Sequence, residues 1–265
     1  MPQGTKMTTL SHDDYGTGPA LVLIHGFPLN RRMWQPQLKV LGDAGYRVIA
    51  PDLRGFGATP PGAGAWTMDA LADDIVALLD TLKIERAVIG GMSMGGYVLL
   101  NLLERYPQRV AAALFLVTRG GGDDAAGKER RTVLAGEVEA GRPGVVTGAF
   151  AALLFARATQ SARPGLLAEV AAMMAETSLA GLSGGLRAIR DRRDYLDRLA
   201  VCTQPALVIG AQEDQAIPAE HGRILAAALP NAEFHLIAGG GHMVNMEQPE
   251  AFNRCLLDFL ARLPR

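Results

Sequence analysis

Short runs of consecutive apolar residues recur along the chain, and a turn and a helical pattern follow each one. The six runs are Ala20–Gly26, Tyr46–Asp52, Arg86–Met92, Val110–Val117, Pro205–Asp214 and Ala232–Gly239. A strand that is apolar on both faces is typical of a parallel sheet covered by helices on both sides. The alternation therefore predicts an α/β fold with a mostly parallel sheet.

A weaker pattern precedes these units. Met7–Leu10 resembles a short strand, and a turn is expected at Asp13–Gly18. Counting this hairpin, we expect eight strands in all. Apolar spacing predicts the covering helices, which are 33–41, Met68–Leu82, 94–107, 219–230 and 249–263.

The alternation stops between Arg119 and Leu199. This stretch is rich in Ala, Gly, Leu and Met, and its pattern predicts several helices and no clear strand. We therefore expect a core domain made of residues 1–118 and 199–265. Residues 119–198 are predicted to form a helical cap inserted after the sixth strand. Such a cap would lie over the carboxyl edge of the sheet, where ligands bind in open α/β folds.

Composition narrows the function without identifying it. The 265 residues carry a net charge of −1, with 49% hydrophobic and 20% charged residues. This balance gives no electrostatic reason to bind nucleic acid or an anionic membrane. No apolar run is long enough to span a bilayer, and the first residues lack the apolar segment of a signal peptide. With only two cysteines, the chain is expected to be cytoplasmic.

One serine lies in a glycine-rich turn directly after an apolar run. Gly91–Gly95 fits G-x-S-x-G, with a predicted strand before it and a predicted helix after it. This context is that of a nucleophile elbow, in which a sharp turn exposes the serine hydroxyl above the sheet. Ser93 is therefore the candidate nucleophile.

A serine needs a base, and the base needs an orienting carboxylate. Among the histidines, His242 follows the last predicted strand, whereas His12, His221 and His235 fall in a hairpin, a surface helix and a strand. Asp214 follows the strand before it, which gives the chain order nucleophile, acid, base. Three other carboxylates remain as alternatives for the acid, namely Glu213, Asp123 and Asp124.

The oxyanion formed during acyl transfer needs preorganised N–H donors. The backbone N–H of Met94, directly after the serine, is one candidate, and the N–H of Phe27 in the turn after the first apolar run is the other. His25 is interpreted as a structural residue that holds this turn. Asp52 and Arg54 are expected to form an ion pair that braces a nearby loop.

An apolar substrate pocket is expected beneath the cap. Its candidate residues are large and apolar and are drawn from several segments, namely Trp34, Trp66, Phe155, Met173 and Met174. For each of them, ordinary core packing is an equally good interpretation.

Five motifs occur in a characteristic order, namely HGFP, PDLRGFG, GMSMGG, GAQEDQAIP and GGGHMVNMEQPEAF. With them the chain resembles the α/β-hydrolase family, and within it the small bacterial carboxylesterases and 3-oxoadipate enol-lactonase-like proteins. The resemblance implies an eight-stranded sheet with a helical cap, a triad of Ser93, Asp214 and His242, and Phe27 and Met94 as oxyanion donors. Val117 stands where that subgroup often has an aspartate, which removes a carboxylate from this position.

The predicted function is hydrolysis of carboxylic esters through an acyl-enzyme. Alternatives on the same site are enol-lactone hydrolysis, which basic residues such as Arg119 would favour, perhydrolysis (cofactor-free haloperoxidase activity), C–C bond hydrolysis, and ligand binding by a receptor. No metal or cofactor is expected, since no cluster has zinc spacing and no G-x-G-x-x-G follows a strand. The expected partner is a small ester or lactone, and a homo-oligomer is left open.

Overall fold

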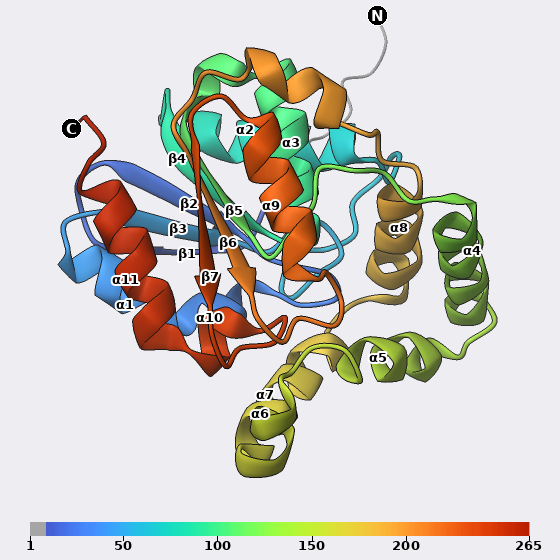
Figure 1. The fold of residues 1–265 in the computed structure, drawn as a ribbon. Coiled ribbons are helices and arrows are strands. Elements are labelled where there is room, and N and C mark those ends of the chain that lie inside the picture. Colours follow the sequence, from blue (N-terminus) through green and yellow to red (C-terminus); the bar gives the residue numbers. More distant parts are fainter. Residues whose placement is uncertain (1–8, 265) are drawn as a thin grey trace, which may run out of the picture.

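A single sheet of seven strands forms the centre of the computed structural model, which describes residues 9–264 (Figure 1). Its order is β1-β3-β2-β4-β5-β6-β7, and every neighbouring pair is parallel except β1 with β3. The strands are β1 (His12–Tyr15), β2 (Ala20–Ile24), β3 (Arg47–Pro51), β4 (Ala87–Met92), β5 (Val110–Leu116), β6 (Ala206–Ala211) and β7 (Ala232–Ile237).

The prediction of eight strands was wrong by one, and the error lies in the N-terminal hairpin. A strand forms at His12–Tyr15, partly where the turn Asp13–Gly18 was expected. Thr9 and Leu10 are not in a strand, and the first half of Met7–Leu10 lies outside the described residues. The reason is pairing: β1 forms the edge of the sheet by pairing antiparallel with β3, and it therefore needs no second strand from a hairpin.

Burial explains why the central strands are apolar throughout. All residues of β4 and β6 are buried, because helices cover both faces of the sheet there. β7, at the edge, has more accessible residues, and His235 is among its exposed positions, as expected for a strand with one neighbour.

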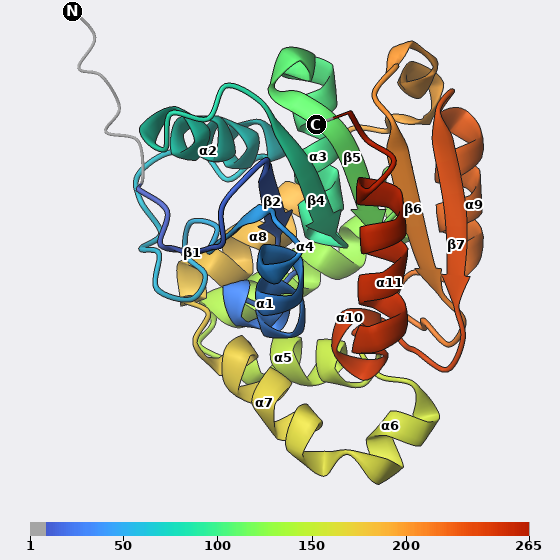
Figure 2. The same cartoon turned by 90° about the vertical axis from the view of Figure 1, so that its left-hand side faces the viewer.

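Helices pack on both faces of the sheet (Figures 1 and 2). α2, α3 and α9 contribute to one buried cluster, and α1, α10 and α11 contribute to the cluster on the opposite face. Their bounds are α1 (Gln35–Asp43), α2 (Met68–Thr81), α3 (Met94–Arg105), α9 (Ala219–Ala228), α10 (Val244–Glu247) and α11 (Pro249–Leu260). Short 3₁₀ turns are η1 (Arg31–Trp34), η2 (Pro107–Arg109) and η3 (Leu196–Val201).

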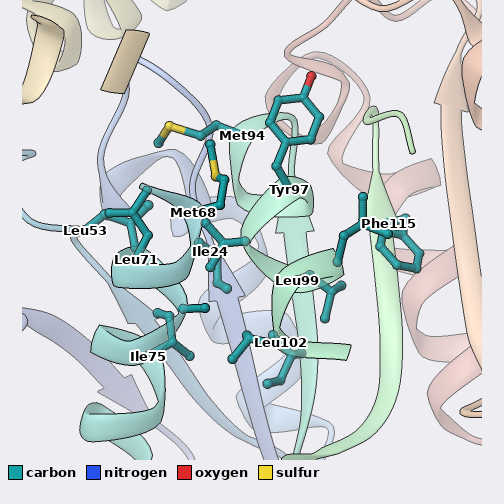
Figure 3. Close-up of a cluster of buried hydrophobic side chains, with 14 of the residues drawn as sticks. Ile24, Leu53, Met68, Leu71, Ile75, Met94, Tyr97, Leu99, Leu102 and Phe115 are labelled. Carbon is teal, nitrogen blue, oxygen red and sulfur yellow. The ribbon is translucent and has the colours of Figure 1, made fainter. Parts of the chain in front are cut away.

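The first cluster fixes the position of α3, the helix that follows Ser93. Figure 3 shows Leu71 and Ile75 of α2 and Leu99 and Leu102 of α3 gathered around Ile24 of β2. Burial of one such side chain contributes roughly 1.5–3 kcal/mol. The helix is therefore held firmly against the sheet, and so is the turn at its start.

The segment between β5 and β6 contains five helices, as expected of an insertion. They are α4 (Ala125–Glu139), α5 (Pro143–Ala151), α6 (Arg157–Ala162), α7 (Pro164–Ala175) and α8 (Leu179–Arg190), and Figure 2 shows α5, α6 and α7 beyond the carboxyl ends of the strands. The insertion follows the fifth strand of the described chain rather than the sixth, since the extra hairpin strand is not observed. Within residues 9–264 no single helix is long and apolar enough to cross a membrane. Helices α7 and α8 reach this length and apolar character only when taken together, and a bend of 93° separates them.

Candidate active site

Ser93 occupies the turn between β4 and α3 in a backbone conformation that few side chains adopt. Its φ is +51° and its ψ is −111°. Two hydrogen bonds from the end of β5 hold the turn: the N–H of Ser93 donates to the carbonyl of Leu116 (3.0 Å), and the hydroxyl of Thr118 donates to the carbonyl of Ser93 (2.8 Å). Such backbone strain costs about 1–3 kcal/mol, and it persists only where the surroundings impose it. The strand and the helix expected on either side of Ser93 are both present.

Two glycines let the backbone fold this tightly. A Cβ on Gly91 would lie 2.2 Å from the carbonyl oxygen of Gly95, and a Cβ on Gly95 would lie 2.3 Å from that of Ile24. Real Cβ atoms do not approach backbone oxygens so closely. The glycines of the G-x-S-x-G pattern are therefore required by contact between the elbow, its own helix and strand β2.

His242 and Asp214 are brought together by loops at the carboxyl ends of β7 and β6. The Nδ1 atom of His242 lies 2.7 Å from Oδ2 of Asp214, and both side chains are buried. The other oxygen of Asp214 accepts hydrogen bonds of 2.8 Å from the backbone N–H groups of Ala216 and Ile217. With the carboxylate fixed on both sides, His242 donates from Nδ1, and its Nε2 remains free to accept a proton.

The other carboxylates considered for the acid have different partners. Asp123 is surrounded by arginines, and Asp124 accepts a hydrogen bond from the N–H of Gly127 at the start of α4 (2.7 Å). Glu213 precedes Asp214 and is half-buried. Asp214 is the carboxylate that contacts His242.

The backbone N–H groups of Phe27 and Met94 are both available as donors. Neither donates to a protein acceptor within the described part of the chain. Met94 is the first residue of α3, where the amide groups of a helix are unpaired and the helix dipole favours negative charge. Phe27 follows β2, whose end packs against the elbow.

His25 has the structural role expected of it. Its Nδ1 lies 2.9 Å from the carbonyl of Gly26, and its Nε2 accepts the N–H of Leu53 at 3.0 Å. The ring is fully buried, and burial lowers its pKa despite the nearby charge of Asp52. Both nitrogens are occupied, so the imidazole is neutral and joins the loops after β2 and β3.

The expected ion pair between Asp52 and Arg54 is not formed. Asp52 accepts hydrogen bonds from the side chain and the backbone of Arg31 and from the N–H of Ala58. Arg54 donates to Asp74 of α2, with a distance of 2.6 Å between Nη2 and Oδ1. Both residues brace loops, but each has a different partner: Asp52 pairs with Arg31, and Arg54 pairs with Asp74.

Ser93 and His242 line the same cavity, which has a volume of about 510 Å³. Ligand pockets are typically of this size. Its apolar wall includes Phe27, Tyr97, Leu134, Phe150, Ile189 and Ile217. Phe150 of α5 stacks edge-on against Phe27 with ring centroids 5.0 Å apart, so the inserted helices complete the cavity directly above the Ser93 turn.

The five apolar residues predicted to line the pocket do not line this cavity. Trp34, Phe155, Met173 and Met174 are buried in the cluster beneath α11 and the inserted helices, and Trp66 packs on Phe56. The alternative interpretation of each as a packing residue is therefore the correct one.

Sequence reasoning missed the residues that form the wall instead. Tyr97 could have been found, because it follows Ser93 by one helical turn and therefore shares a face with it. Phe150 and Leu134 gave no signal, since α4 and α5 lack a clear apolar stripe. Arg130 and Arg131, from the charged stretch 128–131 of the same helix α4, also line the cavity.

The known proteins to which the chain is similar agree with this geometry. Residues 21–254 match the model of the alpha/beta hydrolase family, and the chain therefore belongs to that family. An esterase from Thermogutta terrifontis with malate bound superimposes with a TM-score of 0.93, at 33% identity over 97% of each chain.

Two further relatives carry other activities in their names. The enol-lactonase from Burkholderia xenovorans superimposes with a TM-score of 0.90, at 27% identity over 98% of this chain and 99% of that one. The non-heme chloroperoxidase CPO-A1 of Kitasatospora aureofaciens is 32% identical over 94% of both chains. The family thus supports a hydrolase acting on small molecules, and relatives of similar identity differ in reaction.

Proposed function

We propose that the protein is a serine hydrolase that cleaves carboxylic esters through an acyl-enzyme, with Ser93 as nucleophile, His242 as base and Asp214 as the orienting acid. The observation that carries the proposal is the meeting of three segments. The strained Ser93 turn shares a cavity with His242, whose Nδ1 lies 2.7 Å from Asp214.

The proposed reaction follows from these positions. The Ser93 hydroxyl attacks the ester carbonyl while Nε2 of His242 takes its proton, and Asp214 stabilises the resulting imidazolium. His242 then gives the proton to the leaving alkoxide. A water molecule, deprotonated by the same histidine, attacks the acyl-enzyme and releases the acid and free Ser93.

The N–H groups of Phe27 and Met94 are the proposed donors to the tetrahedral oxyanion. Both are unpaired within residues 9–264, and loss of one such donor typically costs about 3 kcal/mol in the barrier. The helices of residues 119–198 act as the cap in this proposal, since Phe150 and Leu134 close the cavity over the reacting atoms.

Multiple-turnover hydrolysis of p-nitrophenyl acetate and butyrate tests the proposal. The wild-type protein is expected to hydrolyse at least one of these esters, and Ser93→Ala is expected to lose the activity. Hydrolysis retained in Ser93→Ala would exclude Ser93 as the nucleophile. Ligand-dependent stabilisation without turnover would favour a receptor.

A second reaction uses the same acyl-enzyme with hydrogen peroxide in place of water. The support is the 32% identity to a chloroperoxidase over nearly the whole chain. Attack by peroxide on the acyl-enzyme would give a peracid and free Ser93. With acetic acid as the acyl donor, the acyl-enzyme forms with release of water in place of an alcohol. Incubation with acetate and hydrogen peroxide should then produce peracetic acid in wild type and none in Ser93→Ala.

A further inference from the structure

Three arginines converge on one buried carboxylate in the wall of the cavity. Oδ1 of Asp123 accepts hydrogen bonds from Nη2 of Arg119 and, at 3.0 Å, from Nη2 of Arg192, while Oδ2 accepts one from Nε of Arg131. The Asp123 side chain is only 2% exposed. We call Arg119, Arg131 and Arg192 the arginine cluster.

The arginine cluster carries more positive charge than Asp123 can neutralise. Although burial raises the pKa of Asp123, hydrogen bonds from Arg192 and Arg131 lower it to about 2, so the carboxylate is ionised at neutral pH. One negative charge then faces three guanidinium groups. Arg130 and Asp124, which also line the cavity, are both exposed and offset each other in charge.

The cluster is fixed in place and keeps unused donors. Arg192 is buried, stacks over the ring of Tyr97 at 4.3 Å, and donates to the carbonyls of Ile189 and Gly121. Arg119 lines the cavity, and its Nε is buried without a hydrogen-bond partner in the described part of the chain. A buried donor left unpaired is costly, and at this wall it leaves positive charge that no protein acceptor among the described residues offsets.

An anionic group is the acceptor that such a site favours. Guanidinium groups pair with planar carboxylates through parallel hydrogen bonds, and the interaction is strengthened where water is excluded. A compact cavity of 510 Å³ is about 10 Å across, so an anion beside Arg119 and an ester beside Ser93 fit on one small molecule.

We propose that the arginine cluster binds a carboxylate of the substrate, and that the preferred substrates are esters or lactones bearing a free carboxylate a few carbons from the scissile bond. Arg119 and Arg131, which line the cavity, would contact the carboxylate, and Asp123 holds them in place. This inference rests on the proposed role of Ser93.

The test compares 4-nitrophenyl hydrogen adipate with 4-nitrophenyl methyl adipate, which differ only in whether the remote carboxylate is free. We expect kcat/KM of wild type to be about tenfold or more higher for the free acid, as for one charge-assisted hydrogen bond. Added salt should reduce this preference, because it screens the partly exposed arginines.

Arg119→Gln and Arg131→Gln should each lower the ratio of the two kcat/KM values by about tenfold. Arg119→Lys, which keeps the charge, should retain part of the preference. Arg198→Gln is the matched control: it removes the same charge from a surface arginine that pairs with Glu104 outside the cavity, and both rates should be unchanged.

A wild-type ratio of one or less would overturn the inference, and so would an unchanged ratio in both glutamine variants. Should a glutamine variant not fold, the salt series on wild type decides, and a preference insensitive to salt contradicts the arginine cluster as its source. Failure of the proposed function gives a different result, namely no hydrolysis of either ester or hydrolysis that survives in Ser93→Ala.

Discussion

The Oε1 atom of Glu247 accepts a hydrogen bond of 2.8 Å from the backbone N–H of Gly241, the residue directly before His242. Its Oε2 accepts a second, of 2.9 Å, from the N–H of Ala156 between α5 and α6. Glu247 is 5% exposed. One buried carboxylate therefore ties the loop of the proposed base to the inserted helices.

Replacement of this carboxylate should loosen both segments. Glu247→Gln keeps the size but offers one acceptor oxygen for two N–H donors, and its amide would face the second donor. We expect the free energy of unfolding to fall by about 1–3 kcal/mol, the cost of an unpaired buried donor, and kcat to fall with it. Chemical denaturation measures the first effect. The control is the exposed Glu250→Gln, and equal stability of the two variants would contradict the proposed tie.

The proposed nucleophile should react covalently with a fluorophosphonate. The reagent is attacked by an activated serine and mimics the tetrahedral state of ester hydrolysis. Mass spectrometry of the intact protein should show one added group, and peptide mapping should place it on Ser93. An adduct on any other residue would move the nucleophile away from the elbow.

Asp214→Asn should impair catalysis far more than folding. Asparagine can present its N–H₂ to Nδ1 and so favour the wrong tautomer of His242, and the analogous change in a serine protease lowers kcat by about 10⁴-fold. Steady-state kinetics with a p-nitrophenyl ester measures the loss. Glu213→Gln is the neighbouring control and should remain near wild type. A near-wild-type rate in Asp214→Asn would return Asp123 and Asp124 to consideration.

Gly95→Ala should prevent the native elbow from forming. Its Cβ would lie 2.3 Å from the carbonyl oxygen of Ile24, and neither backbone segment is free to move. We expect a loss of more than about 3 kcal/mol in stability, within the range for strained core substitutions. Gly136→Ala in α4 meets no atom within 4 Å and should stabilise by up to about 1 kcal/mol. Thermal unfolding separates the two, and equal midpoints would refute the packing argument.

Protonation of His25 should destabilise the fold as the pH falls. Burial lowers the pKa of this histidine in the folded state, whereas the unfolded chain titrates near 6.5. The unfolded state therefore binds the extra proton first. The contribution of His25 to the free energy of unfolding is constant above about pH 6.5. Below that pH it falls by up to about 1.4 kcal/mol per pH unit, until the folded-state pKa is reached.

The measurement is the free energy of unfolding between pH 7.5 and 5 in wild type and in His25→Gln. The variant should show a shallower slope below about pH 6.5. His221, whose pKa is lowered by burial and by Arg119, contributes to both proteins and cancels in the comparison. Identical slopes would show that His25 does not remain neutral in the folded state.

Predictions that depended on residues adjacent in the chain fared best. The Ser93 turn, the helix after it and the structural role of His25 follow from short motifs, because a turn between a strand and a helix is decided largely by its own glycines. The prediction of the N-terminal hairpin failed because the position of β1 is determined by its pairing with β3, which lies further along the chain.

The pocket could not be predicted for a related reason. Large apolar side chains such as Trp34 and Met173 suit both a core position and a cavity wall. The residue type alone therefore does not distinguish the two. Which face of α4 and α5 turns towards Ser93 depends on how the helices pack, and their sequences carry little amphipathic signal.

The sequence by itself determined the alternation of buried strands and helices, the strained serine turn and the chain order of the three candidate catalytic residues. These features are local, since apolar period and glycine placement act over a few residues. The tertiary structure alone decided that Asp214 reaches His242, that Phe150 closes the cavity, and that three arginines gather on Asp123. The contacts of Asp214 with His242, of Phe150 with Phe27 and of Arg192 with Asp123 join segments distant in the chain. Loops at the ends of β6 and β7 bring the first pair together, and packing of the inserted helices brings the other two together.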